Sequence, residues 1–335
     1  MLMDNLFARD GEKTNYDIVF SIPVHEKFEV VLDQIMNINF YNKNCAIIIH
    51  LSQVFDYKNS LLSREEFETI VFEIGNVYIN PDSLRTGPFD IIQAHISNFY
   101  YMYGICNFTF YSMLASNELF VKTNLLSHIS GYDCGIQTNR NAKNNMEWVQ
   151  AACAVMYDED LPKILRELNS ADIYGSQIEG TFYKRELLFE ICNLITKHYD
   201  YKGMTFKYAR EEIYFSTIAM ALAEDRKITV MENGFFTYVP WENIDDMRYV
   251  PYFRINSLRK ENNVFAIKRV DRKLNDPVRC FVRKGTYYET ERKLIPVQIF
   301  SNARLLIMEI GKFRQNMNHA LVKKSKQILR LIPSK

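Results

Sequence analysis

The chain has 335 residues, and its 41 lysines and arginines nearly balance 40 aspartates and glutamates, which leaves a net charge of +1. This length suits one large α/β domain with a sizeable core. Hydrophobic residues make up 47% of the chain, the usual share for a globular protein. The charge balance argues against a nucleic-acid partner, because such proteins carry a marked excess of positive charge.

The six cysteines are widely spaced and form no Cys-x-x-Cys pair. We therefore expect reduced thiols and no metal site built from them. The first residues, Met1 to Lys13, lack the apolar run of a signal peptide. No stretch approaches the roughly 18 to 20 apolar residues that a membrane span needs. These features predict a cytoplasmic protein.

The chain opens with a β-α-β pattern. Tyr16 to Val24 is an apolar run of strand length, and His25 to Met36 places its apolar residues at helical spacing. Cys45 to Leu51 is a second apolar strand. Because both strands are apolar on their two faces, we expect them to pair in parallel inside a covered sheet.

The pattern continues toward the middle of the chain. Val77 to Asn80 predicts a short strand, Thr86 to Pro88 breaks the chain, and Phe89 to Tyr103 has helical spacing. Phe108 to Leu114 predicts another central strand, which ends in the polar residues Ala115 to Glu118. Residues 15–125 therefore form the first half of the predicted α/β domain, with the β-α-β pattern that nucleotide-binding folds share.

Residues 126–300 form the second half of the predicted domain, to which the family resemblance described below assigns the acceptor and catalytic roles. Its polar stretch Gly131–Asn145 predicts a long loop, and Ile173–Phe182 predicts a strand and a turn. Three helices are predicted at Asp160–Asn169, Lys184–His198 and Tyr208–Glu224. Two short strands are predicted at Lys227–Met231 and Gly234–Val239. The whole pattern predicts an α/β fold with a mixed, mostly parallel sheet flanked by helices in a domain of residues 1–300.

Residues 301–335 differ from the rest in composition. They hold eight lysines and arginines against the single acid Glu309, with apolar residues interleaved. This predicts a basic amphipathic helix, which suits contact with the anionic inner surface of a membrane. A helix packed on the domain with a solvated basic face accounts for the pattern equally well, so both interpretations stay open.

No glycine-rich loop that could cradle a phosphate is present among only 12 glycines. Arginine and lysine side chains are the other way to hold a diphosphate. The stretch from Arg254 to Arg269 offers Arg254, Arg259, Lys268 and Arg269. A charged surface loop is the simpler reading of these four residues taken alone.

Two carboxylates one residue apart are a common arrangement for holding a divalent metal ion, because such hard cations prefer oxygen ligands. Asp158-Glu159-Asp160 has that spacing, but it directly precedes a predicted helix, where acidic residues are favourable for another reason. Glu211 and Glu212 lie side by side on a predicted helix and point about 100° apart. One of them can therefore face a site while the other faces elsewhere.

Several stretches, in order, resemble the core-2/I-branching N-acetylglucosaminyltransferase and protein xylosyltransferase family. Tyr208 to Thr217 resembles its YSPDExxxxT element, and Phe265 to Lys268 its FAxKF element. Five further stretches resemble other family elements: Ile18 to His25, Ile47 to His50, Thr86-Gly87, Leu114 to Lys122 and Gly175 to Glu186. The resemblance spans roughly residues 17 to 275.

The resemblance implies a GT-A-like, Rossmann-type fold and an inverting transfer from a UDP-sugar, with no metal or other cofactor. It makes Glu212 the catalytic base, and Lys268 with Arg254 the holders of the diphosphate. It further assigns four residues to the nucleotide sugar (His25, His50, Thr86 and Gly87) and four to the acceptor (Glu118, Ser176, Glu179 and Glu211). The donor sugar would be N-acetylglucosamine or xylose-like, and the acceptor a glycan or lipid-linked glycan of the cell surface, such as lipopolysaccharide or capsule.

The chain departs from the family pattern at three places. Leu51-Ser52 replaces an aspartate near the nucleotide, Ala115 to Glu118 lacks a glycine, and Arg210 replaces a proline. Two alternatives therefore stay open. One is a metal-dependent GT-A transferase that uses other carboxylates, and the other is a non-catalytic partner in polysaccharide assembly.

Overall fold

The computed structural model describes residues 13–87, 91–138, 149–198, 208–240 and 249–284. Residues Met1–Tyr287 form one compact unit, and Tyr288–Lys335 form a second unit that lies outside the described residues. The predicted basic segment 301–335 belongs to that second unit, so the structure does not test it. Within the described residues, every helix is too short or too polar to span a bilayer.

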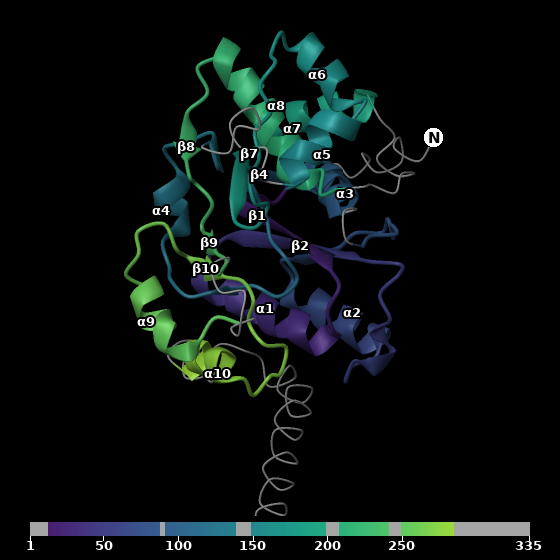
Figure 1. Cartoon of the computed structure of the whole chain (residues 1–335). Helices are drawn as coiled ribbons and strands as arrows, with labels where there is room; N and C mark the ends of the chain where they lie inside the picture. Colours follow the sequence, from purple (N-terminus) through teal and green to yellow (C-terminus); the bar gives the residue numbers. More distant parts are fainter. Residues whose placement is uncertain (1–12, 88–90, 139–148, 199–207, 241–248, 285–335) are drawn as a thin grey trace, which may run out of the picture. The chain divides into compact units, whose positions relative to one another are not determined.

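A seven-stranded sheet forms the centre of the first unit (Figure 1). Its strands run in the order β3-β2-β1-β4-β7-β6-β8, and β7 alone is antiparallel to its neighbours. The bounds are β1 Asn15–Val24, β2 Cys45–Leu51, β3 Val77–Ile79, β4 Asn107–Met113, β6 Cys134–Ile136, β7 Thr181–Lys184 and β8 Val230–Glu232. The first four strands follow the 3-2-1-4 order of doubly wound nucleotide-binding sheets.

A second, three-stranded sheet packs beside the first. It contains β5 (Leu119–Phe120), β10 (Ala266–Ile267) and β9 (Thr237–Tyr238), in that order. Strand β10 is antiparallel to β5 and parallel to β9. This small sheet matters for function because it brings residues from three distant parts of the chain next to the polar turn after β4.

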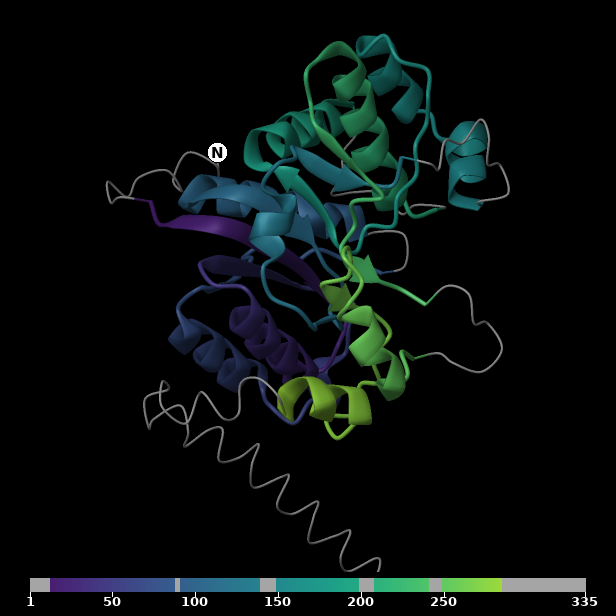
Figure 2. The same ribbon diagram turned by 90° about the vertical axis from the view of Figure 1, so that its left-hand side faces the viewer.

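Helices cover both faces of the main sheet, as Figures 1 and 2 show. Their bounds are α1 Phe28–Tyr41, α2 Arg64–Ile74, α3 Ile91–Ile105, α4 Leu125–Ile129, α5 Val149–Tyr157, α6 Leu161–Glu167, α7 Arg185–His198, α8 Glu211–Asp225, α9 Ile255–Leu258 and α10 Pro277–Lys284. Short 3-10 turns occupy Tyr57–Asn59 (η1) and Tyr252–Arg254 (η3). Helices α1, α2, α9 and α10 lie on one side, and α3, α5, α6, α7 and α8 on the other.

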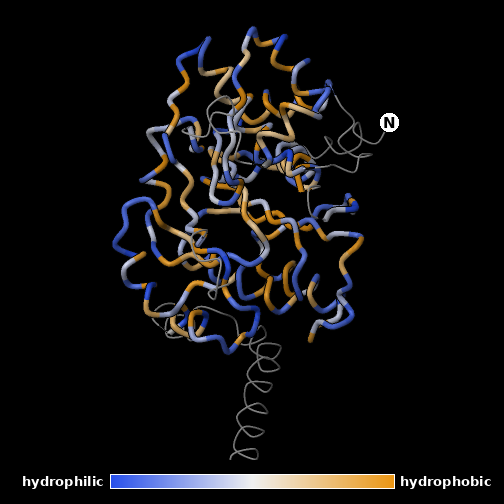
Figure 3. The backbone as a smooth tube through the Cα atoms, in the orientation of Figure 1, coloured by the Kyte–Doolittle hydropathy of each residue, from blue (hydrophilic) through white to orange (hydrophobic). Residues whose placement is uncertain are grey.

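Two hydrophobic cores result from the alternation of side chains along the strands. In β1, Phe20 and Ile22 face the core beneath α1, whereas Val19 faces the core beneath α3, α7 and α8. Because successive strand residues point to opposite faces, a strand buried on both sides must be apolar throughout. Figure 3 shows the apolar residues concentrated in the strands and on the helix faces that cover them.

The α/β fold with a mostly parallel sheet flanked by helices is confirmed, and the parallel pairing of β1 with β2 agrees with the prediction. The prediction of one continuous loop over Gly131–Asn145 is wrong at its start, since Cys134–Ile136 forms β6. This strand has only three residues, too few to show an alternating pattern. Residues 139–148 of the predicted loop lie outside the described residues.

Candidate functional site

The candidate site lies at the edge of the sheet where β1, β2 and β4 have their carboxyl ends. Between β1 and β4 the strand order reverses, because β2 lies on one side of β1 and β4 on the other. Open α/β sheets bind their ligands beside such a reversal. Strand β7 runs antiparallel to β4, so the residues that precede it reach the same edge.

His25, the first residue after β1, lies at this reversal. Its Nε2 is 3.0 Å from Thr86 Oγ1 and 3.1 Å from Thr86 O. Its backbone N–H donates to Ser116 Oγ in the turn after β4, at 3.2 Å. Burial lowers the pKa of the His25 imidazole. A neutral imidazole that joins these two segments can position a ligand without adding charge.

His50 is fully buried at the end of β2. Its Nε2 accepts a hydrogen bond from the backbone N–H of Leu84 at 2.9 Å, and burial lowers its pKa to about 4. This hydrogen bond from Leu84 fixes the position of the segment that also contains Thr86. Gly87 ends this described segment, and apart from its chain neighbours no atom of the described residues lies within 4 Å of the position that a Cβ would take there.

Glu118 lies in the turn between β4 and β5, and its side chain is fully buried. Its carboxylate accepts hydrogen bonds from the backbone N–H of Ala115 at 2.5 Å and from Thr237 Oγ1 at 2.8 Å. Burial, with the nearby charge of Glu179, raises the pKa of Glu118 to about 8. At neutral pH this carboxyl group therefore holds a proton for most of the time.

Glu179 and Lys268 form an ion pair beside Glu118. The Glu179 side chain is 8% exposed and that of Lys268 29% exposed. Burial opposes the charge of Lys268, but Glu179, Glu118 and Glu212 outweigh it, so the pKa of Lys268 is raised. The lysine is therefore a permanent cation that three carboxyl groups surround.

Glu212 reaches this cluster from the first turn of α8. It is half-buried, and its charge acts on Lys268. Its neighbour Glu211 is buried, at 5% exposure, so the two side chains lie in different surroundings, as expected for consecutive helix residues. The backbone carbonyl of Glu212 accepts from the N–H of Ser176 at 2.8 Å, so Ser176 ties the loop before β7 to α8.

The start of α8 is held by a buried polar cluster around Asp158. Its carboxylate accepts from Tyr208 and Tyr214, and Arg210 Nε lies 2.9 Å away. The same carboxylate accepts from the backbone N–H of Leu161 at 2.9 Å. Asp158 thus orders the residues just before Glu212, and its bonds match the helix-terminus interpretation of Asp158–Asp160.

Gly180, which follows Glu179, is required by the backbone. Its φ is +77°, a left-handed conformation that disfavours other residues. A Cβ at this position would collide with the backbone N and side chain of Thr237. Only glycine allows the Glu179 turn to approach β9 this closely, and this approach brings Thr237 to Glu118.

The segment after Lys268 crosses the carboxyl end of β1. Arg272 donates from Nε to both carboxylate oxygens of Glu26, at 2.7 Å each. Glu26 is buried and directly follows His25. This pair therefore joins the two halves of the site across 246 residues of sequence.

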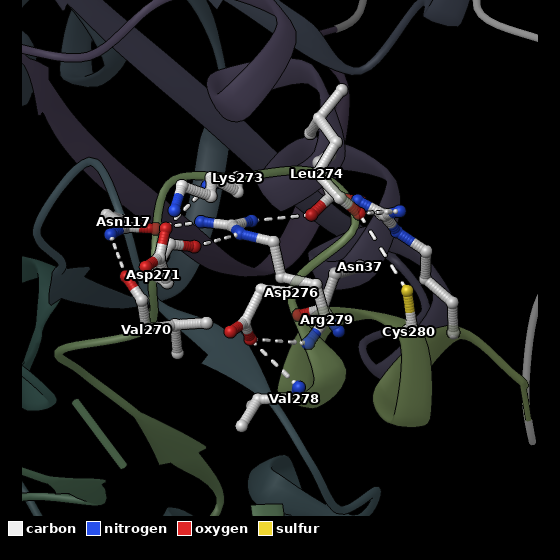
Figure 4. A network of polar contacts seen from close by, with 12 residues as sticks. Asn37, Asn117, Val270, Asp271, Lys273, Leu274, Asp276, Val278, Arg279 and Cys280 are labelled. Carbon is white, nitrogen blue, oxygen red and sulfur yellow. Dashed lines mark hydrogen bonds and ion pairs between the residues drawn. The ribbon is translucent and has the colours of Figure 1, made fainter. Parts of the chain in front are cut away.

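Arg279 of α10 binds the segment that follows Lys268 through its contact with Asp271 (Figure 4). Its guanidinium is fully buried, donates from Nε to Asp271 O at 2.7 Å, and contacts Asn117 Oδ1. It also pairs with Asp33 of α1 at 2.5 Å, and Arg283 pairs with the second oxygen of Asp33 at 2.6 Å. Burial opposes the charge of Asp33, but the two arginines outweigh it and lower its pKa.

Arg254 is the second predicted cation for the diphosphate. Its guanidinium lies 5.5 Å from the ring centroid of Tyr238 in β9. The backbone N–H of Lys268 donates to the carbonyl of Tyr238 at 2.9 Å. Arg254 and Lys268 thus approach the same strand from different segments. Among the described residues, no group of three or more His, Cys, Asp or Glu side chains is arranged to hold a metal ion.

Several polar residues of this site were not predicted as site residues, and they include Ser116, Thr237, Asp33 and Arg279. Each contacts a residue far away in the sequence, such as Thr237 with Glu118 and Arg279 with Asp33. Neither periodicity nor spacing carries that information. Only Asp276-Pro277, an aspartate and proline pair typical of a helix start, marks the beginning of α10 in the sequence.

No protein-family model matches the chain, and no curated sequence matches it significantly. Solved structures with partial similarity include the galactosyltransferase LgtC in complex with donor and acceptor sugar analogues. That alignment has 10% identity and a TM-score of 0.36, over 75% of this chain and 86% of that one. An active-site mutant of LgtC aligns with 10% identity and a TM-score of 0.38, over 84% and 98%.

Proposed function

We propose that this protein is a glycosyltransferase that moves a sugar from a UDP-sugar to a hydroxyl group of an acceptor, with inversion at the anomeric carbon. The observation that carries the proposal is the meeting of Glu212, Glu179 and Glu118 around Lys268 at the carboxyl edge of the sheet. A displacement at a sugar carbon needs a base for the acceptor and a cation for the leaving group. This cluster offers both.

Glu212 is the proposed base. It is half-buried, and Lys268 is the nearby cation whose pKa it affects. The carboxylate takes the proton of the acceptor hydroxyl while that oxygen forms a bond to the anomeric carbon. The bond from the anomeric carbon to the diphosphate breaks in the same step, and UDP departs with the electron pair.

Lys268 and Arg254 are the proposed partners of the departing diphosphate. Both are cations at neutral pH, and they approach β9 from separate segments. Charged donors placed in advance lower the free energy of a transition state in which negative charge develops on the leaving group. We propose that they make a divalent metal unnecessary, as in the family that the sequence resembles.

Glu179 and the protonated Glu118 are proposed to bind acceptor hydroxyls. Glu179 Oε1 is engaged by Lys268, whereas its buried Oε2 has no donor among the described residues. A buried carboxylate oxygen is costly unless a donor reaches it. A sugar hydroxyl is such a donor, and it would be held close to Glu212.

The donor sugar is proposed to be N-acetylglucosamine or xylose-like, and the acceptor a precursor of a cell-surface glycan such as lipopolysaccharide or capsule. Both assignments rest on the sequence resemblance. The basic segment 301–335 supports the same setting, because eight cations against one acid suit an anionic inner membrane surface. The protein would then work in the cytoplasm on lipid-linked acceptors.

A thermal-shift screen against nucleotide sugars tests the donor class. A ligand that binds the folded state raises the melting temperature by mass action. We expect UDP-sugars to raise it for the wild type, and Lys268→Met to weaken the effect. An unchanged melting temperature with every nucleotide sugar would favour the non-catalytic partner. Donor hydrolysis or transfer that EDTA abolishes and Mn²⁺ restores would favour the metal-dependent alternative.

A further inference from the structure

We infer that the exposed face of η3 and α9 is a second membrane-contact surface, which binds anionic lipid bilayers independently of residues 301–335. The surface contains Tyr252, Phe253, Arg259, Lys260 and Phe281, and we refer to it as the Phe253 surface. It lies within the part of the chain that the structure describes. The inference adds a location to the proposed function, since a lipid-linked acceptor would be reached from the bilayer.

Two large aromatic side chains protrude at this place. Phe253 is 71% exposed and Tyr252 53% exposed. The next residues bury Ile255 and Leu258 in the core beneath α1, so the helical run presents its other side outward. An exposed Phe is unfavourable in water, and aromatic residues are enriched at the interface between lipid and water.

Contacts between side chains join three elements into this one surface. The ring of Tyr252 lies 5.2 Å from that of Phe281 in α10, in an edge-to-face arrangement. The guanidinium of Arg259 lies 5.1 Å from the Phe281 ring. Figure 2 shows α9 and α10 side by side at one end of the first unit. The aromatic rings and the cation are therefore neighbours in space.

Two basic residues, Arg259 and Lys260, follow the aromatic residues of η3, and Arg259 contacts the Phe281 ring. Lys260 is exposed, pairs with no carboxylate of the described residues, and lies in the turn that directly follows α9. Residues 249–284 hold ten basic residues and three acidic ones: Arg254, Arg259, Lys260, Lys268, Arg269, Arg272, Lys273, Arg279, Arg283 and Lys284 against Glu261, Asp271 and Asp276. Glu26, Asp33 and Glu179 neutralise part of this excess from elsewhere in the fold.

Charge complementarity favours an anionic bilayer as the partner. Protruding aromatic rings beside cations match the interfacial region of a membrane, where rings insert between head groups and cations contact lipid phosphates. The described part of the chain ends at Lys284, and residues 285–300 separate it from the basic segment 301–335. Two moderate contacts on one chain bind a surface far more tightly than either contact alone.

The test uses full-length Phe253→Trp and Phe72→Trp proteins with vesicles of phosphatidylcholine, alone or mixed with phosphatidylglycerol, with brominated acyl chains. Phe72 of α2 is 84% exposed and outside the Phe253 surface, so it is a matched control. We expect the brominated chains to quench the added tryptophan at position 253 but not at position 72, with the wild type as the baseline. Equal quenching at both positions, or quenching at neither, overturns the inference.

Vesicle binding of two further pairs gives an independent readout. We expect Phe253→Ser to weaken binding to phosphatidylglycerol vesicles by roughly tenfold, from the lost burial of the ring, and Phe72→Ser to leave it unchanged. Lys260→Glu should weaken binding by a similar factor, more at low salt, and the exposed Lys227→Glu should not. Wild-type binding by Phe253→Ser contradicts the inference, whichever result Lys260→Glu gives.

Sugar transfer to a soluble acceptor separates this inference from the proposed function. Phe253→Ser should retain wild-type transfer, because the side chain lies outside the carboxylate cluster. Loss of vesicle binding with intact transfer supports the lipid surface. Intact vesicle binding in Phe253→Ser refutes the lipid surface, whatever the transfer assay shows about the enzyme.

Discussion

Replacing Glu118 by glutamine should change how the stability of the protein depends on pH. The folded-state pKa of Glu118 is about 8, against 4.5 for the ordinary carboxyl group. Between these values the folded protein binds a proton that the unfolded chain releases. The stabilisation from this proton is complete below the unfolded pKa and is lost as the pH rises through about 8.

The size of the effect follows from the width of this window. Each pH unit within it lowers the free energy of unfolding by about 1.4 kcal/mol, so the wild type should lose about 3 kcal/mol between about pH 5 and about pH 7.5. Glutamine resembles the protonated carboxyl group and does not titrate. The variant should therefore gain about 3 kcal/mol relative to the wild type over the same interval.

Urea-induced unfolding at matched ionic strength measures this difference, with thermal unfolding as a second probe. Glu232→Gln, at an exposed glutamate of β8, is the control for removal of a carboxylate in general. A constant difference between Glu118→Gln and wild type at the two pH values would show that Glu118 is ionised throughout. The carboxylate cluster would then carry one more negative charge than we infer.

Three further variants test the supports of the site. Lys268→Met should lower the free energy of unfolding by about 3 kcal/mol, because it leaves the buried Glu179 carboxylate without its cation. The double variant Lys268→Met with Glu179→Gln should regain stability in urea-induced unfolding, because no unpaired carboxylate remains, but it should not regain nucleotide binding. Asp33→Asn should cost about 3–5 kcal/mol in the same assay, since the buried Arg279 and its neighbour Arg283 lose their shared carboxylate, and a cost below about 1 kcal/mol would contradict the account. Gly180→Ala should cost more than about 1 kcal/mol in thermal unfolding, from its positive φ and the collision with Thr237, whereas Gly131→Ala, which has open space, should cost less.

Much of the fold could be predicted because its information is local. The apolar runs of β1 and β2 and the helical spacing of α1 are complete within the segments themselves. Helix α2 begins with a capping box of Ser63 and Glu66, and a serine followed three residues later by glutamate is a local signal that the sequence itself contains. Strand β6 could not be predicted, because three residues carry no periodicity and their pairing with β7 is set by the rest of the sheet.

The site could be predicted only in part. Glu118, Glu179, Glu212 and Lys268 were named from a family resemblance, since a lone glutamate in a sequence indicates no more than a polar surface. Their meeting depends on the small sheet of β5, β10 and β9, in which β10 pairs with β5 across more than a hundred positions of sequence. The pair of Asp33 with Arg279 is likewise a product of the folded chain, since its members are 246 residues apart.

Glycosyl transfer by Glu212→Gln tests the central claim most directly. The assay follows a radiolabelled UDP-sugar that the wild type turns over, and it compares Glu212→Gln with Glu224→Gln, an exposed glutamate on the same helix. A positioned general base contributes roughly 10²–10⁴-fold to a rate. We predict a loss of this size for Glu212→Gln, with unchanged UDP binding, and wild-type transfer by Glu224→Gln. Near-normal transfer by Glu212→Gln would contradict the assignment of Glu212 as the base, and with it the mechanism proposed here.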